Sequence, residues 1–354
     1  MQTVDAGVNR SSRGNGVVHR YRFSCVLLAT MAAFAVPAWA YHLVREIPVP
    51  GDGGWDYLSA DGHYLFVSHG ERVEVLDLGT LTLAGSIPGT PGVHGIALAD
   101  DLGRGYVSAG ASGSIVVFDL KSLVRLTGIK TSGQNPDAIL YEPGTHRVFA
   151  FNGRSRNVTV IDANRNEVIG SIALDAKPEF AVVDAAGHVF VNLEDKNSIA
   201  MIDPKTLTVQ SVWSLKGCEE PTGLAIDRAH ARLFSVCSNR VMEIVDASSG
   251  RLVAQVPIGE NVDGAGFDAG RQVAFASGGD GTLTVVREET PEKFSVAETS
   301  ATKPGARTMV VDETTHRVFL STARRGPAPA PSATQPRPRP AVVPGTFEVL
   351  VLEP

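Results

Sequence analysis

Seven residues of this chain, one from each of seven repeated units, are of types that could bind a cation or a polar molecule. Each stands where the first strand of its unit is expected to begin: Asp56, His94, Asp137, Glu179, Thr222, Asp263 and Arg307. The ends of the second strands are expected on the same side and add four more: His69, Asn152, Asn192 and Cys237. Carboxylates brought so close repel one another unless a cation or raised pKa values relieve them.

Oxygen-rich clusters of this kind are typical of Ca²⁺ or Mg²⁺ sites and of pockets for small polar molecules. Four of these residues are candidate metal ligands: Asp137, Asn152, Glu179 and Asp263. If the site were catalytic, His94 or His69 would be the general base. The alternative is a hydrated group of side chains that neutralise one another, with no ligand.

The elements that must position these residues come from a repeat of about 42 residues. An apolar run ending in an acid recurs, with its acids at Asp77, Asp119, Asp162, Asp203 and Asp246, in steps of 42, 43, 41 and 43 residues. Less regular copies end at Arg287 and Glu353. Such a period, built from short β-rich segments between Gly, Asp and Pro, is typical of β-propellers. The sequence therefore predicts an all-β, seven-bladed propeller of four-stranded antiparallel blades.

Both ends of this repeat are irregular. The last unit stops after its third strand, residues 347–352, while residues 43–49 form an unpartnered strand before the first unit. Pairing the two closes the ring and removes exposed edges. The last unit also contains an insertion at 326–345, rich in Pro, Ala and Arg, which cannot form a core. We expect either a passive loop or a recognition arm over the adjacent mouth.

Five histidines recur in the turns between first and second strands, on the face opposite the mouth: His63, His146, His188, His230 and His316. Their equivalent positions indicate a role in the turns. The recurring acids at the ends of the third strands also precede turn residues, and an Asp in that position bonds to its own backbone.

Residues 1–40 have the composition of a cleaved secretory signal: four arginines, an apolar run from Phe23 to Val36, and Ala38-Trp39-Ala40. The alternative is an uncleaved anchor. We expect a protein of residues 41–354, periplasmic or secreted and monomeric. Losing four arginines and one aspartate takes the formal charge from −6 to −9, which argues against nucleic acid as a partner. No later segment is long and apolar enough to span a membrane.

Two cysteines remain after cleavage. Cys218 precedes the first strand of the fifth unit and Cys237 ends its second strand, so an antiparallel hairpin brings them together. An oxidising compartment permits a disulfide between them; the alternative is two buried free thiols.

The second strands carry a degenerate Tyr-Val-Thr-Asn signature, at Phe66-Val67-Ser68-His69, Tyr106-Val107-Ser108-Ala109 and Phe149-Ala150-Phe151-Asn152. In this the chain resembles the YVTN-repeat, YncE-like family of periplasmic seven-bladed propellers. The resemblance implies secretion and seven blades. It implies little about activity, because fold likeness is a weak basis for function.

No motif for a nucleophile, haem attachment, a zinc site or a phosphate loop is present. The sequence therefore favours a non-catalytic binding or scaffold protein, whose partner is a small polar ligand, a metal ion or a periplasmic protein. The main alternative is a metal-dependent lactonase, hydrolase or lyase with Ca²⁺ or Mg²⁺ at the mouth. A redox accessory role beside a quinoprotein or cytochrome is a third.

Overall fold

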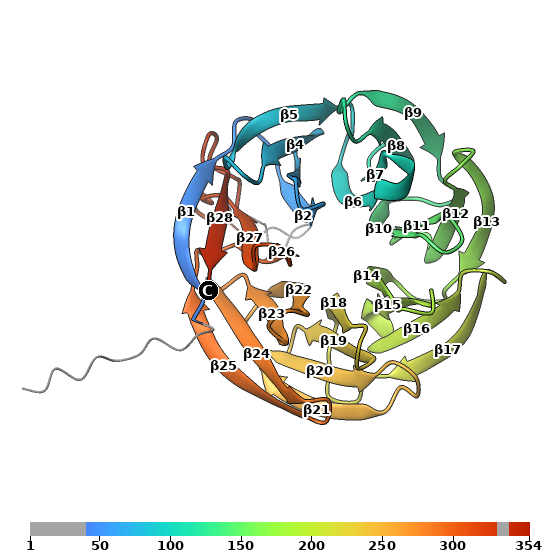
Figure 1. The fold of residues 1–354 in the computed structure, drawn as a ribbon. Helices are drawn as coiled ribbons and strands as arrows, with labels where there is room; N and C mark the ends of the chain where they lie inside the picture. The colour runs from blue at the N-terminus through green and yellow to red at the C-terminus, as the bar shows by residue number, and fades with distance from the viewer. Residues whose placement is uncertain (1–39, 331–339) are drawn as a thin grey trace, which may run out of the picture. The chain divides into compact units, whose positions relative to one another are not determined.

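The computed structural model describes residues 40–330 and 340–354, so the predicted signal segment, apart from Ala40, lies outside the described residues. In the described ranges, 28 strands form seven four-stranded antiparallel sheets arranged around a central channel (Figure 1). This confirms the predicted seven-bladed propeller. The first strand of each blade lines the channel and the fourth lies outermost (Figure 1).

The strands of the first four blades have these bounds. Blade 1 contains β2 (Trp55–Ala60), β3 (Tyr64–His69), β4 (Arg72–Asp77) and β5 (Thr82–Pro88). Blade 2 contains β6 (Val93–Ala99), β7 (Arg104–Ala109), β8 (Ser114–Asp119) and β9 (Arg125–Lys130). Blade 3 contains β10 (Pro136–Glu142), β11 (Arg147–Asn152), β12 (Asn157–Asp162) and β13 (Glu167–Ala173). Blade 4 contains β14 (Pro178–Val183), β15 (Val189–Leu193), β16 (Ser198–Asp203) and β17 (Thr208–Ser214).

The remaining blades follow the same plan. Blade 5 contains β18 (Pro221–Asp227), β19 (Arg232–Cys237), β20 (Val241–Asp246) and β21 (Leu252–Pro257). Blade 6 contains β22 (Val262–Asp268), β23 (Val273–Gly278), β24 (Thr282–Thr290) and β25 (Lys293–Ala301). Blade 7 contains β26 (Thr308–Asp312), β27 (Arg317–Thr322), β28 (Glu348–Glu353) and β1 (His42–Pro48). Two short 3-10 turns, η1 (Asp100–Leu102) and η2 (Glu194–Lys196), interrupt blades 2 and 4.

The core lies between blades and is built from equivalent positions. At one equivalent position, every second strand carries a fully buried aromatic side chain: Phe66, Tyr106, Phe149, Phe190, Phe234, Phe275 and Phe319. Burying such a side chain stabilises the fold by roughly 1.5–3 kcal/mol. Because every blade buries its aromatic against a neighbour, the period of about 42 residues translates directly into a ring.

The ring closes as predicted. β1 pairs antiparallel with β28, with Ile47 opposite Val349 and Leu43 opposite Leu352, so the N-terminal segment is the outermost strand of blade 7 (Figure 1). Just before β1, the ring of Tyr41 packs edge-on against Phe275 at 4.9 Å between centroids. Residues from the start of the described chain therefore contact both blade 7 and blade 6.

The Pro-rich insertion at 326–345 leaves the ring between β27 and β28. Its described ends are held together by an antiparallel bridge between Arg325 and Val342 and by a hydrogen bond from the Gly326 amide to the Ala341 carbonyl. The Arg325 guanidinium also lies 5.0 Å from the ring of Trp55 in blade 1. These contacts anchor the base of the insertion beside the mouth; residues 331–339 lie outside the described part.

The predicted disulfide is confirmed. Cys218 and Cys237 are bonded, their Cα atoms are 5.3 Å apart, and both are almost completely buried. The bridge links the segment before β18 to the end of β19, so it fastens the inner hairpin of blade 5.

Replacing both cysteines with serine is expected to lower the free energy of unfolding by about 3 kcal/mol. The bridge spans 19 residues, and closing a loop of that size in the unfolded chain has about this effect in the chain-entropy model. Denaturant unfolding of the double variant beside the parent protein measures the difference. Equal midpoints with equal slopes would show that the bridge adds nothing.

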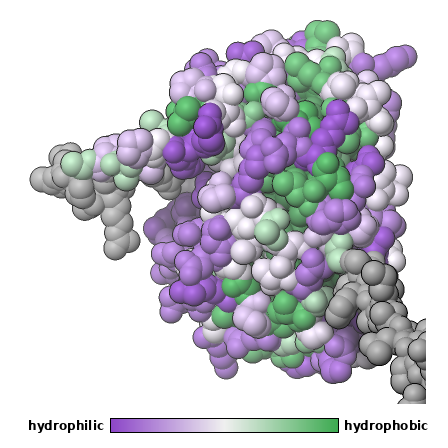
Figure 2. Space-filling view, turned by 90° about the vertical axis from the view of Figure 1, so that its left-hand side faces the viewer, coloured by the Kyte–Doolittle hydropathy of each residue, from purple (hydrophilic) through white to green (hydrophobic). Residues whose placement is uncertain are grey.

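On the side of the molecule formed by β1, hydrophilic and hydrophobic residues are interspersed over the surface (Figure 2). Most exposed large hydrophobic residues lie on outermost strands: Val44, Leu83, Leu126, Val168, Val212, Leu252 and Val296. In the described ranges, no helix has the length and hydrophobicity needed to cross a lipid bilayer.

Candidate functional site

The predicted mouth residues share one structural position at the start of each first strand, and in most blades that position is a backbone bulge, which sequence spacing does not reveal. In six blades the pairing of first and second strands shifts register around this residue, for example between Trp55 and Leu58 and between Val93 and Ile96. Bulges of this kind re-aim side chains and are frequent beside functional sites. In blade 7 there is no such shift, and Arg307 directly precedes β26.

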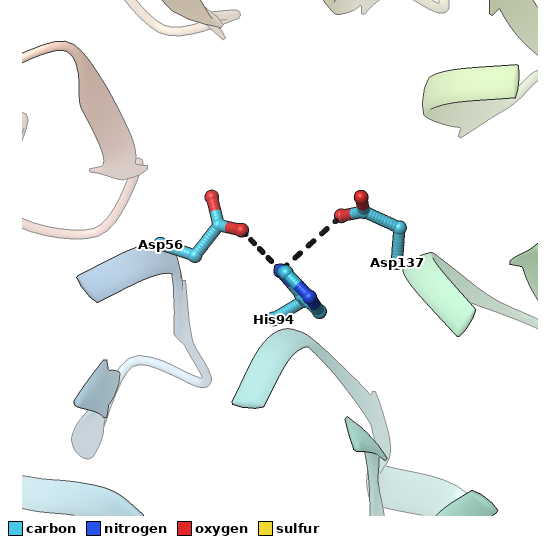
Figure 3. A group of neighbouring side chains, drawn as sticks. All are labelled: Asp56, His94 and Asp137. Carbon is cyan, nitrogen blue, oxygen red and sulfur yellow. Dashed lines mark hydrogen bonds and ion pairs between the residues drawn. The ribbon is translucent and has the colours of Figure 1, made fainter. Parts of the chain in front are cut away.

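Three of these side chains, from three successive blades, converge (Figure 3). The imidazole of His94 lies between Asp56 and Asp137: its Nδ1 is 2.6 Å from Asp56 Oδ2 and 3.7 Å from Asp137 Oδ1. One ligand atom from each lies within 4.8 Å of the other two, and all three residues are half-buried. Two carboxylate oxygens and one imidazole nitrogen at this spacing could hold a divalent cation.

The backbone around His94 leaves little freedom to its ring. A Cβ added at Gly110 would lie 2.7 Å from His94 Nε2. A larger residue at position 110 would therefore have to displace the imidazole of His94. The small residue at this position leaves space for the ring orientation in which Nδ1 faces the two aspartates.

The electrostatics of the three residues show strong coupling. Burial alone would lower the pKa of His94, but the hydrogen bond with Asp56 and the charges of Asp137 and Glu179 raise it to about 9. Burial raises the pKa of Asp137 to about 6, although His94 opposes that rise. At neutral pH the imidazole is therefore protonated and neutralises part of the surrounding negative charge.

The other predicted carboxylates take cationic partners. Lys177 Nζ lies 2.5 Å from Glu179 Oε1 and also contacts Glu194, while Arg307 Nη1 lies 3.3 Å from Asp263 Oδ2. Burial and then the charge of Asp137 raise the pKa of Glu179 to about 8. The mouth is thus lined by acidic side chains whose charges influence one another's pKa values.

Burial likewise raises the pKa of Asp263 to about 6, against the influence of Arg307, and the charges of Asp56 and Asp137 contribute to that rise. These four groups, His94 included, all bind protons more tightly than usual. Raised pKa values in one concave region are typical of functional sites, although structural ion pairs also produce them.

Several predicted residues lie outside the convergent group. His69 is buried, stacks on Phe347 at 3.9 Å and has a pKa lowered by burial. Asn152 donates to Thr159 Oγ1 at 2.9 Å, within its own blade. The Thr222 hydroxyl donates to the Val262 carbonyl. Of the four candidate metal ligands, Asp137 alone lies in the convergent group, and Cys237 is taken by the disulfide.

Sequence reasoning missed four residues that contribute to this region. Lys177, one residue before β14, and Glu194, directly after β15, complete the ion pairs of Glu179. Deeper in the channel, the rings of Tyr57 and Phe180 lie 5.2 Å apart. They come from blades 1 and 4, which are not neighbours, so this pair spans the channel below the acidic mouth. The positions of Lys177 and Glu194 beside strand ends were a usable signal; the aromatic pair had none.

Two cavities adjoin these groups. One of about 410 Å³ lies in the channel and is lined by residues of all seven first strands, Tyr57 and Phe180 among them. The other, of about 770 Å³, lies at the base of the insertion and shares Arg307 with the mouth. Its lining also includes Lys303, Arg324 and Arg325, so it is more basic than the mouth itself.

No family model matches this sequence, and no curated protein does. Solved structures with a similar fold include the hydrazine synthase of Kuenenia stuttgartiensis, with 17% identity, a TM-score of 0.64, and coverage of 75% of this chain and 91% of that one. The WD40 repeats of RRP9 match with 9% identity, a TM-score of 0.69, and coverage of 88% and 97%. A chain of a mitotic checkpoint complex matches with 12% identity, a TM-score of 0.71, and coverage of 92% and 99%. At these identities the likeness concerns the fold alone.

Proposed function

We propose that this chain is an exported, non-catalytic binding protein that holds a divalent cation at the channel mouth. The observation that supports this best is the convergence of Asp56, His94 and Asp137, from three separate blades, on one point. The three blades each place a ligand-type side chain in a backbone bulge, where strand pairing does not demand it.

The donor set narrows the kind of cation. The sequence suggested Ca²⁺ or Mg²⁺ held by oxygen atoms, whereas the convergent group includes an imidazole nitrogen. Carboxylate oxygen suits Mg²⁺, Ca²⁺ and Mn²⁺, and imidazole suits Zn²⁺ and other transition metals. Mn²⁺ and Zn²⁺ therefore fit better than Ca²⁺ or Mg²⁺. A bound cation would displace the proton of His94 and take over its neutralising charge.

The hydrolase or lyase alternative has less support. A general base near neutral pH needs a pKa close to 7 and a free nitrogen facing the substrate. His94 has a pKa of about 9, and its Nε2 lies beside Gly110. His69 is buried against Phe347. Neither predicted base is placed for the task.

Export is part of the proposal. It rests on the basic and apolar leader at 1–40, on the disulfide of blade 5 and on the resemblance to YVTN-repeat propellers. The chain of the exported protein would begin at Tyr41, one residue before β1. Intact-mass measurement of the exported protein tests this, and a mass that retains residues 1–40 would count against it.

Calorimetric titration of the exported protein with Mn²⁺ tests the cation site. Asp137→Asn keeps the size of the side chain but removes a ligand charge, so we expect affinity to fall by more than the roughly 10–100-fold that loss of a supporting residue costs. Asp101→Asn is the matched control, because Asp101 is about half exposed and pairs with His146 instead. Equal affinities for the two variants would contradict the proposal.

A further inference from the structure

A second group of possible ligands lies in the turn between β18 and β19, on the face opposite the mouth. His230 Nδ1 is 2.7 Å from Asp227 Oδ2 and 2.7 Å from Glu288 Oε1. Asp227 ends β18 in blade 5, whereas Glu288 belongs to β24 in blade 6. The group therefore joins two blades.

Part of this group belongs to the repeat. In blade 4, His188 pairs in the same way with Asp184 of its own turn, at 2.9 Å, whereas His316 of blade 7 pairs with Asp268 of the neighbouring blade 6, at 2.8 Å. A turn histidine beside one acid is thus a recurring structural feature, as the sequence suggested. What blade 5 adds is a second, buried carboxylate.

The second carboxylate, that of Glu288, comes from a strand of blade 6 that is longer than its equivalents in the other blades. β24 has nine residues, whereas the third strands of the other six blades have six each. Glu288 lies in the added part, and the tip of the same hairpin is tied to blade 5: Arg232 donates to the Pro291 carbonyl and to Glu292 Oε1, both at 2.7 Å. The long β24–β25 hairpin is visible in Figure 1.

The carboxylates of Asp227 and Glu288 are buried, so their negative charges need a compensating partner. Asp227 and Glu288 are only 2% and 4% exposed. Asp227 Oδ2 and Glu288 Oε1 have His230 Nδ1 as their ion-pair partner, but neither contact has the geometry of a hydrogen bond, and Glu288 Oε2 has no hydrogen-bond partner among the described residues. Burial and then the charge of Asp227 raise the pKa of Glu288. Two adjoining buried carboxylates are costly unless a proton or a cation lies between them.

One imidazole does not meet this demand. Nδ1 carries at most one hydrogen, yet two carboxylates lie at equal distance from it. The nearby Arg232 is paired with Asp246 and Glu292. Within residues 40–330 and 340–354, Glu288 Oε2 has no hydrogen-bond partner, although Glu288 is almost fully buried.

We propose that Asp227, His230 and Glu288 form a second cation site, distinct from the mouth, that takes a divalent transition-metal ion. One nitrogen and two carboxylates suit Zn²⁺ or Mn²⁺. The side chain of His230 is 31% exposed, so an ion can enter from solvent and complete its coordination with water. The ion would fasten the extended hairpin of blade 6 to the turn of blade 5.

The test removes the mouth site first. Asp137→Asn protein is titrated with Zn²⁺ and is expected to bind one equivalent. Adding Glu288→Gln, which removes one ligand charge without changing shape, should weaken that binding at least tenfold; His230→Gln should do the same. Adding His188→Ala, in the equivalent turn that lacks a third acid, should leave affinity unchanged. Melting curves in EDTA establish that every variant folds.

The inference is overturned if Asp137→Asn protein binds no Zn²⁺, or if Glu288→Gln and His230→Gln leave its binding intact. The same titrations distinguish failure of this second site from failure of the proposed site at the mouth. Glu288→Gln alone should keep one equivalent, at the mouth. If the parent protein binds a single equivalent that Asp137→Asn keeps and Glu288→Gln loses, the second site stands and the mouth site fails.

Discussion

An exported chain that begins at Gly51, and so lacks residues 41–50, is expected not to fold. The missing segment includes β1, the outermost strand of blade 7, and buries Tyr41, Ile47 and Val49. Three such side chains contribute roughly 5–9 kcal/mol, which is comparable with the whole stability of a domain, about 5–15 kcal/mol. Its loss would also leave β28 as an exposed edge. Circular dichroism and thermal unfolding measure the effect.

Single substitutions refine this prediction. Ile47→Asp places a charge in the core formed with Val349 and Phe319, and should lower the melting temperature strongly. Val44 lies on the same strand but is 43% exposed, so Val44→Asp should leave the melting temperature nearly unchanged. A truncated protein that melts like the full-length form would show that the ring does not depend on β1.

Affinity for Mn²⁺ is expected to fall by about 100-fold as the pH drops from about 8.5 to about 6.5, because the ion must displace the proton of His94. The pKa of His94 is about 9, so over this range the imidazole is protonated and each pH unit reduces apparent affinity roughly tenfold. Near pH 6 the protonation of Asp137 steepens the decline. Calorimetric titrations across the range provide the slope.

His94→Gln is the control, because it removes the titrating ligand and leaves a polar side chain of similar length. Its residual affinity should change little from pH 8.5 down to about 7. An affinity of the parent protein that stays flat, or that increases as the pH falls, is incompatible with His94 as a ligand.

The same pKa values link pH to stability. His94 has a raised pKa, so the stability it contributes is fully present below its ordinary pKa of about 6.5 and is lost as the pH rises through about 9. The raised pKa values of Asp137 and Asp263 act in the same direction, between their ordinary value of about 3.8 and about 6. A bound cation would offset this loss, so its stabilising effect should be greatest at high pH.

The fold was predictable because the chain repeats. Anchor acids such as Asp77 and Asp119 recur at the period of a blade, and the unpaired segments at 43–49 and 347–352 have one obvious partner each. The disulfide between Cys218 and Cys237 followed from the hairpin that their positions imply. Each of these features depends on a repeated pattern or on strands that are adjacent in the fold, and such features can be recognised from sequence.

The site was predictable only as a ring of seven positions. Which members meet depends on how neighbouring blades are rotated and on the bulges that re-aim side chains such as Asp56 and Asp137. The partner of Glu179, Lys177, lies outside the repeat pattern, and Glu288 lies beyond the repeated part of its strand. The contact of Glu288 with the turn of blade 5 joins two blades and has no signature in the spacing of one chain.

The central claim concerns one point in space, and anomalous diffraction from a crystal of the exported protein soaked in Mn²⁺ at about pH 8.5 locates it. We predict an anomalous peak between Asp56, His94 and Asp137, at about 2.0–2.4 Å from a carboxylate oxygen of each aspartate and from His94 Nδ1. The peak should be absent from crystals of Asp137→Asn. A parent crystal in which this point carries no peak, while His94 keeps its hydrogen bond to Asp56, would contradict the account.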